Sequence, residues 1–163
     1  MKKLVLNREY LTRHVFGAVV FLAMGAWFGY DGFVRYPAAD AAALYETIEG
    51  AKPPAGADLG KFKRQKCASQ RIFSAVLLVV GVVIALRLAQ SARFRFSWGD
   101  DGFSAGSREY SYDDIVSVDS SRWEKNSVFS VCVPSYRIVL DGWHHNGVSE
   151  FREFLLGRMK ESS

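Results

Sequence analysis

The 163-residue sequence predicts two membrane-spanning helices followed by a small α+β domain with an antiparallel sheet and a C-terminal helix. Two observations predict the membrane part. Residues 15–30 and 72–86 contain no charged side chain, and charged residues flank both segments. A third observation predicts the domain, since the alternation of apolar and polar residues after position 93 is typical of strands. This length excludes a large multidomain enzyme.

The chain begins with a basic segment, residues 1–14, and the first span is predicted at residues 15–34. Its uncharged core reaches about 24 Å, short of the roughly 30 Å of hydrocarbon in a bilayer. Extension to residue 34 supplies the missing length if Asp31 reaches the headgroups. A secretory signal peptide is the alternative interpretation, but no pair of small residues marks a cleavage site before Trp27.

The second span, predicted at residues 72–89, is more apolar than the first. Its core holds eleven Leu, Ile, Val or Phe residues against seven in the first core, and its end is extended if Arg87 snorkels outward. The alternative is a pair of core helices in a soluble protein. Such helices normally show a polar stripe every three to four residues, and residues 76–86 have none, so membrane insertion is favoured.

Charge decides the predicted topology only narrowly. Two spans place both termini on one side of the membrane and residues 35–71 on the other, with seven Lys or Arg residues near the membrane on each side. The basic start before the first span favours cytoplasmic termini. Residues 1–86 carry a net charge of +5 and the remainder −1, so the total of +4 comes from the membrane-flanking segments and no nucleic-acid partner is predicted.

The loop of residues 35–71 is expected to contain two helical segments. Residues 38–49 are rich in alanine and follow Pro37, which favours a helix start, while Gly50 can end this helix. Residues 57–71 are mostly helix formers, so the second span is expected to begin as a longer helix outside the membrane. Its basic side chains contact anionic lipid or a partner in one interpretation and solvent in the other.

The C-terminal domain, residues 93–161, is predicted to contain about five strands and one helix. The strands are expected at residues 94–98, 103–105, 115–119, 128–133 and 136–140, with residues 99–102 as a turn. Apolar residues recur at helical spacing from Val148 to Met159, and Ser149 is expected to cap this helix. The helix is then expected to cover one face of the sheet.

The stretch from Phe94 to Lys160 resembles the bacterial PH-like domains that occur as membrane-tethered modules beside one or two spans. The residues that carry the resemblance are 101–103, 112–119, Trp123 and 138–143. The resemblance implies a split sheet capped by the C-terminal helix and a cytoplasmic location, and it implies no activity. The loop of residues 35–71 departs from the short turn that joins the spans of the simplest members.

Small residues are the first candidate for a functional role. Gly25 and Gly29 lie four residues apart in the first span, and Ser74, Gly81 and Ala85 in the second span are expected to face them. Small residues allow transmembrane helices to approach closely, either within one hairpin or between two copies of the chain. Glycines that occur there by chance are the alternative.

Charged residues at the predicted membrane boundaries are the second candidate. Asp31 and Arg71 fall at the same boundary and are expected to form an interfacial ion pair. Arg93 and Arg95 follow the second span and are expected to contact lipid headgroups, which attract a basic side chain by about 1 kcal/mol.

Metal, redox and catalytic sites are not predicted. His144 and His145 are adjacent, whereas chelating pairs are usually spaced two apart on a strand or four apart on a helix. Cys67 and Cys132 lie on opposite sides of the second span in the predicted topology, so they cannot pair. Asp101 and its acidic neighbour occupy the turn where a phosphoinositide pocket needs basic residues.

We therefore expect a bacterial inner-membrane protein that is not an enzyme and has no cofactor or metal. Its predicted role is that of a scaffold or accessory protein that acts through contacts with a protein partner or a second copy in the lipid bilayer. The alternative is a small subunit of a larger transport or secretion complex.

Overall fold

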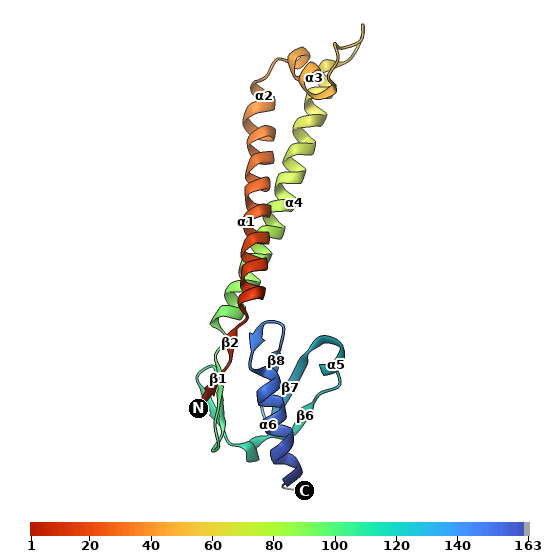
Figure 1. The fold of residues 1–163 in the computed structure, drawn as a ribbon. Coiled ribbons are helices and arrows are strands. Elements are labelled where there is room, and N and C mark those ends of the chain that lie inside the picture. The colour runs from red at the N-terminus through yellow and green to blue at the C-terminus, as the bar shows by residue number, and fades with distance from the viewer. Residues whose placement is uncertain (162–163) are drawn as a thin grey trace. The chain divides into compact units, whose positions relative to one another are not determined.

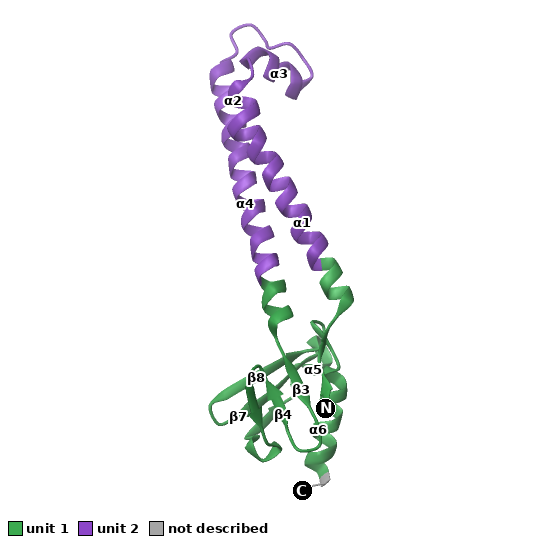
Figure 2. Ribbon diagram, turned by 90° about the vertical axis from the view of Figure 1, so that its left-hand side faces the viewer, with its two compact units in different colours: residues 1–13, 87–163 green, residues 14–86 purple. Residues whose placement is uncertain are grey.

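A computed structural model describes residues 1–161 of the protein. The chain divides into two compact units: residues 14–86 form a helical unit, and residues 1–13 together with the described residues from 87 onward form an α+β unit (Figure 2). We describe each unit by itself.

The helical unit is built on two long helices. Helix α1 (Arg8–Tyr30) continues through a π-helical turn, η1 (Asp31–Arg35), into the short helix α2 (Tyr36–Ala38), while helix α4 (Leu59–Arg93) is continuous over 35 residues (Figure 1). Residues 8–38 and 59–93 are both long and apolar enough to cross a membrane. Both helices extend beyond the predicted spans, and α4 includes the helical segment that was expected before the second span.

The start of helix α3 (Ala41–Glu49) corrects one detail of the sequence prediction. Pro37 lies inside α2, and the chain then becomes extended at Ala39 and Asp40. The Asp40 carboxylate starts α3 by accepting hydrogen bonds from the amides of Ala42 and Ala43, at 2.9 and 3.1 Å. Gly50, at φ +70°, ends α3 as predicted, because glycine adopts this left-handed conformation without steric cost.

Helix α3 packs against the first turns of α4. Leu44 is buried, and the rings of Tyr45 and Phe62 lie 4.8 Å apart. Two of the basic side chains of residues 57–71 are bonded within this unit, since Lys63 Nζ donates to the carbonyl of Ala39 at 2.6 Å and Lys66 pairs with Glu49 at 3.1 Å. These two lysines are therefore engaged by the protein rather than presented freely to solvent or lipid.

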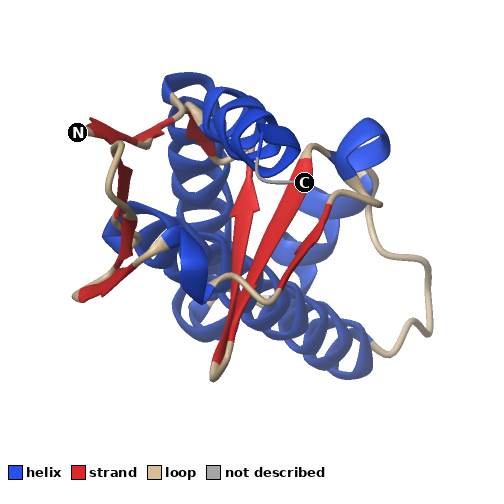
Figure 3. Cartoon of the chain, turned by 90° about the horizontal axis from the view of Figure 1, so that it is seen from below, coloured by secondary structure: helices blue, strands red, loops and turns tan. Residues whose placement is uncertain are grey.

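The α+β unit contains antiparallel strands in three groups (Figure 3). The first group has the order β1 (Lys2–Lys3), β3 (Phe96–Trp98), β4 (Phe103–Ala105), β5 (Arg108–Tyr110). The second pairs β2 (Val5–Leu6) with β9 (His145–Asn146), and the third has the order β6 (Ser117–Asp119), β7 (Val128–Val133), β8 (Tyr136–Asp141). Helical pieces are η2 (Tyr112–Asp114), α5 (Trp123–Asn126) and α6 (Val148–Glu161).

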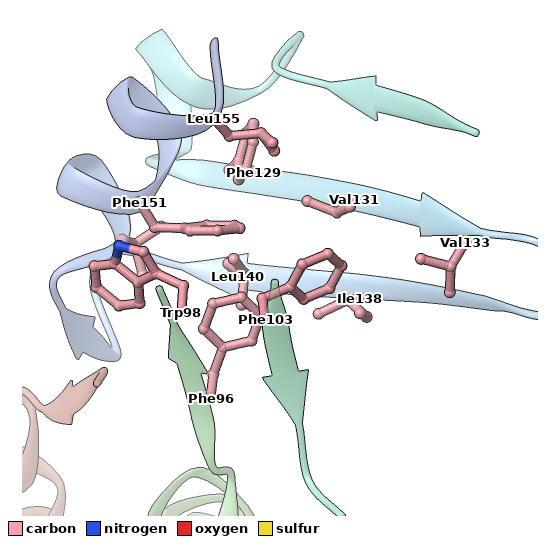
Figure 4. Packing of buried hydrophobic residues seen from close by; sticks show 11 residues of the cluster. Phe96, Trp98, Phe103, Phe129, Val131, Val133, Ile138, Leu140, Phe151 and Leu155 are labelled. Atoms are coloured by element: carbon pink, nitrogen blue, oxygen red, sulfur yellow. The ribbon is translucent and has the colours of Figure 1, made fainter. Parts of the chain in front are cut away.

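One core holds this unit together. Helix α6 contributes Phe151 and Leu155, which face side chains from β3, β4, β7 and β8 (Figure 4). The Phe151 ring lies 4.8 Å from Phe96 and 5.4 Å from Trp98, between ring centroids. The alternation of inward and outward residues along β7 and β8 explains why these two strands were predicted within a residue of their bounds.

The N-terminal strands are the largest departure from the sequence prediction. The basic segment was treated as a flank of the first span, but Lys2 pairs with Trp98, and Val5 pairs with Asn146 in the second group. Strands of only two residues are too short to show the alternation by which strands are recognised. The segment before α1 and the segment after α4 thus belong to one folded unit, so the chain returns to the unit from which it started.

Smaller corrections concern the ends and breaks of elements. Strand β3 begins at Phe96 because α4 continues to Arg93, and β5, β9 and α5 were not predicted. Ser149 is the second residue of α6 rather than its cap. Gly147, at φ +96°, provides the sharp turn that precedes α6.

Candidate functional sites

Glycines allow α1 and α4 to approach closely in the helical unit. A Cβ atom on Gly25 would lie 2.8 Å from Leu78 Cγ, and one on Gly81 would lie 2.8 Å from Leu22 Cγ. Each glycine therefore receives a leucine of the opposite helix. Backbone is close as well, since the same hypothetical atoms would lie 3.1 and 3.2 Å from the leucine amide nitrogens.

A buried hydrogen bond crosses this seam between the helices. Ser74 Oγ donates to the carbonyl oxygen of Gly25 at 2.8 Å, and Ser74 is 4% exposed. A Cβ atom on Gly29 would lie 2.9 Å from the same hydroxyl oxygen. The structure thus brings Gly25, Gly29 and Gly81 into the contact between the two helices of one chain, whereas Ala85 is half-buried on α4.

The seam ends at a polar cluster around η1, which we call the turn site and define by Asp31, Gly32, Phe33, Arg35 and Arg71. The Asp31 side chain is only 7% exposed, and Arg35 Nη1 lies 3.4 Å from Asp31 Oδ1. Arg71 Nε donates to the carbonyl oxygen of Gly32 at 3.0 Å, and its guanidinium carbon lies 4.8 Å from the centre of the Phe33 ring.

This arrangement corrects the predicted ion pair. Asp31 and Arg71 do meet at the same level of the hairpin, but the salt-bridge partner of Asp31 is Arg35, four residues later on its own helix. Arg71 binds the neighbouring backbone carbonyl instead. The pair therefore forms within one helical segment rather than between the two helices, and its spacing of four residues is the standard signal for such a pair.

Pro37 explains why the Gly32 carbonyl is available to Arg71. In η1 the Tyr36 amide bonds to the carbonyl of Asp31, five residues earlier. In the same register, the Gly32 carbonyl would accept a hydrogen bond from the amide of residue 37. Residue 37 is proline, which has no N–H, so this carbonyl remains free for Arg71. Gly32 also permits the close approach of the two helices at this point, because a Cβ atom there would lie 3.0 Å from the backbone nitrogen of Arg71.

Exposed aromatic rings and one unsatisfied amide lie in the turn site or close to it in the sequence. Trp27, Tyr30 and Phe33 are 65%, 58% and 63% exposed and follow one another at intervals of three residues. On the other helix, the buried Oε1 atom of Gln70 has no hydrogen-bond partner among residues 1–161. An unsatisfied buried acceptor costs stability, so this end of the seam is less completely bonded than the part around Ser74.

A second cluster lies in the α+β unit, where the start of α1, the end of α4 and β9 meet at Ser91. We call it the junction site and define it by Tyr10, Ser91, Asp141, His144 and His145. The Tyr10 hydroxyl lies 3.4 Å from Ser91 Oγ, and His145 Nε2 lies 3.1 Å from the Ser91 carbonyl oxygen. Because a carbonyl only accepts, Nε2 of His145 carries the proton.

The junction site favours a neutral His145. Burial disfavours the imidazolium form and is the largest cause that lowers the pKa of His145 below its usual value. His144 lies beside it. The centroid of the His144 ring is 4.3 Å from that of the Tyr10 ring, with the planes tilted by 43°, and His144 Nε2 lies 3.7 Å from Asp141 Oδ2. A cavity of about 190 Å³ lies among these residues and is also lined by Phe94.

The remaining candidates are placed at the surface or in the core. Arg93 is the last residue of α4, Arg95 lies between α4 and β3, and both side chains are exposed. Both cysteines are free, with Cys67 buried in α4 and Cys132 half-buried in β7. Within residues 1–161, no three His, Cys, Asp or Glu side chains come together in a geometry that would hold a metal ion.

A hollow of about 510 Å³ lies along the turn between β3 and β4 and against β5. Its lining includes Asp100, Asp101 and Glu109. Tyr112 anchors the turn through its hydroxyl, which donates to the carbonyl of Gly99 at 2.6 Å, and burial raises the pKa of Tyr112. The acidic lining repels phosphate groups, which agrees with the sequence argument against a phosphoinositide pocket at this turn.

Comparisons with protein-family models, with curated proteins and with solved structures give no match for this chain. Its function is therefore argued from the residues themselves.

Proposed function

We propose that this protein is an integral protein of the bacterial inner membrane, in which a two-helix hairpin carries a cytoplasmic PH-like domain that acts as a non-catalytic scaffold. The observation that carries the proposal is the apolar surface of the two long helices. In each helix, only 11% of the most apolar 18-residue stretch is buried within the protein. The large apolar side chains exposed there include Val15, Phe16, Val19, Met24, Ile72, Phe73, Val76, Val79, Val82, Val83 and Leu86.

Such a surface is unfavourable in water. Exposed apolar patches beyond a few hundred Å² are rare on soluble monomers, and these residues cover successive turns of both helices. In a bilayer the same side chains meet lipid tails, and the helices satisfy their own backbone hydrogen bonds. Insertion of the Leu, Ile, Val and Phe residues contributes roughly −2 to −4 kcal/mol for the first span and −3 to −7 kcal/mol for the second.

The seam between the helices supports a hairpin inside the membrane. Lipid tails are as apolar as leucine, so helices in a bilayer associate through close packing of small residues and through hydrogen bonds. The reciprocal contacts of Gly25 with Leu78 and of Gly81 with Leu22 provide the close packing. The bond from Ser74 to Gly25 provides the hydrogen bond.

The assignment of the α+β unit as PH-like rests on the resemblance in sequence, and the element order is compatible with it. Two antiparallel groups of three and four strands are followed by α6, whose Phe151 and Leu155 fill the core between them. The added strands β1 and β2 come from the segment before α1. A scaffold role is proposed because the junction site does not resemble an activated nucleophile: Ser91 offers its carbonyl, not its hydroxyl, to His145.

Fractionation tests membrane insertion directly. Cells are broken without detergent, and the membrane fraction is washed with alkaline carbonate, which strips peripheral proteins. We expect the full-length chain to remain in the pellet and to be released only by detergent. Recovery in the aqueous fraction or in the carbonate wash would contradict the proposal.

Cysteine labelling tests the proposed orientation. In a Cys67→Ser and Cys132→Ser background, Ala51→Cys places a thiol in the exposed loop between α3 and α4, and Ser107→Cys places one in the exposed turn between β4 and β5. With cytoplasmic termini, a membrane-impermeant maleimide labels Ala51→Cys in intact cells and labels Ser107→Cys only after lysis. The opposite pattern would reverse the orientation.

Affinity purification in mild detergent separates the scaffold from the alternative, a small subunit of a transport or secretion complex. A channel or transporter recovered in stoichiometric amounts would favour the subunit. Recovery of a soluble or peripheral partner that depends on the α+β unit would favour the scaffold.

A further inference from the structure

The turn site holds two arginines whose positive charges are only partly compensated. Arg35 pairs with the Asp31 carboxylate and Arg71 donates to the backbone carbonyl of Gly32, so the two guanidinium groups are held by adjacent residues. Asp31 supplies one negative charge for two positive charges. Arg71 uses only its Nε atom in this bond, which leaves its four other N–H donors, and the Arg35 side chain is 52% exposed.

The proposed insertion places the turn site among the lipid headgroups. Asp31 follows directly after the uncharged core of the first span, and Arg71 directly precedes that of the second. The exposed rings of Trp27 and Tyr30 lie at the same end of the span, and these residue types concentrate at the membrane–water boundary. The stacking of Arg71 on Phe33 keeps the guanidinium at this level.

We propose that the turn site binds the phosphodiester headgroup of a membrane phospholipid, with Arg35 and Arg71 donating hydrogen bonds to the phosphate oxygens. Guanidinium groups bind phosphate through pairs of N–H donors, which fits donors that are already oriented by the protein. One phosphodiester also balances the charge, since two arginines, Asp31 and one monoanion sum to zero. The acyl chains would lie along the exposed rings of the helix pair. This inference rests on the proposed membrane insertion.

Native mass spectrometry of the full-length protein in an uncharged detergent tests the proposal. The protein is titrated with phosphatidylglycerol, with diacylglycerol, which lacks the phosphate, and with water-soluble glycerophosphoglycerol, which lacks the acyl chains. We expect saturable binding of phosphatidylglycerol, none of diacylglycerol, and no displacement by the soluble diester at equal concentration. The combined Arg35→Gln and Arg71→Gln variant is expected to bind roughly thirtyfold more weakly.

The matched control removes two positive charges elsewhere on the same unit. Lys61 and Arg64 are exposed on α4 outside the predicted span, so Lys61→Gln with Arg64→Gln makes the same change in net charge. We expect this control to bind as the unaltered protein does. Equal loss in the control, or no loss in the turn-site variant, would overturn the proposal. If the double variant does not fold, Arg35→Gln alone decides, since the Arg35 side chain is 52% exposed and its ion-pair partner Asp31 lies four residues earlier in the same helical segment.

Two further results are distinguishable. Displacement of the lipid by glycerophosphoglycerol at equal concentration would show a general phosphate site and overturn the lipid assignment. A protein that resists carbonate extraction but shows no difference between the two double variants would refute the headgroup site alone. A protein that carbonate extracts would refute the membrane proposal as well.

Discussion

The helical unit and the α+β unit use apolar residues in opposite ways. In the α+β unit the large side chains point inward, and Phe129 and Phe151 have no exposed surface. In the helical unit the large side chains point outward, and glycine, serine and a few leucines form the contact between the helices. The difference is the one expected if lipid surrounds the helical unit, as proposed, because water drives large apolar groups together whereas lipid leaves the contact to the closest-fitting small groups.

The largest expected effect comes from truncating the same residue type in each unit. Phe151→Ala removes a ring that touches Phe96, Trp98 and Phe129, and we expect it to destabilise the α+β unit by about 3–5 kcal/mol. Phe16→Ala removes a ring that is 70% exposed on α1 and is expected to change stability little. Denaturant unfolding in detergent, followed by tryptophan fluorescence, measures both. Equal losses would contradict the proposed difference between the units.

A pair of glycine substitutions tests the contact between α1 and α4, and a smaller loss of stability is expected. Gly25→Ala places a methyl group 2.8 Å from Leu78 Cγ and 3.1 Å from its amide nitrogen, so the helices must separate, at a cost of about 1–3 kcal/mol. Gly17→Ala is the control, because nothing lies within 4 Å of its added atom. Thermal unfolding in detergent should show a lower midpoint for Gly25→Ala only. A matching fall for Gly17→Ala would indicate a lost contact with another copy instead.

The pH dependence of the α+β unit is expected to depend on His145. Burial lowers the pKa of His145 in the folded state below the 6.5 of the free side chain. As the pH falls through 6.5, the unfolded chain therefore takes up a proton before the folded chain does, and stability decreases. Thermal midpoints measured between pH 8 and pH 5 should fall less for His145→Gln than for the unaltered protein. A fall of the same size in both would assign the dependence to other groups.

The two units also differ in what the sequence allowed one to predict. The two long apolar helices were predicted from their uninterrupted apolar runs, and β6, β7, β8 and α6 were predicted from periodic apolar patterns. Strands β1 and β2 have two residues each, and only their partners, more than ninety residues away in the chain, stabilise them. Such pairing leaves no local signal, and the same reason hid the junction site, since Tyr10, Ser91 and His145 come from three separate segments.

The turn site was predicted in part. The charge pattern predicted Asp31 and Arg71 at one membrane boundary, and the structure brings Arg71 to the carbonyl of Gly32, the residue after Asp31. What the pattern did not reveal was the π-helical turn. Pro37 predicted only a helix start, whereas its missing N–H leaves a carbonyl free five residues earlier.

The smallest expected effect concerns the hydrogen bond inside the seam. Ser74→Ala removes the bond to the Gly25 carbonyl, and hydrogen bonds between membrane helices contribute about 0.6 kcal/mol on average. Ser69→Ala, the same change on the same helix but outside the predicted span, is the control. Unfolding in detergent should separate the two variants by about this amount. A loss of several kcal/mol on Ser74→Ala would show that polar bonding rather than the fit of Gly25 against Leu78 holds the helices together, and the contrast between the two units would then rest on hydrogen bonds instead of shape.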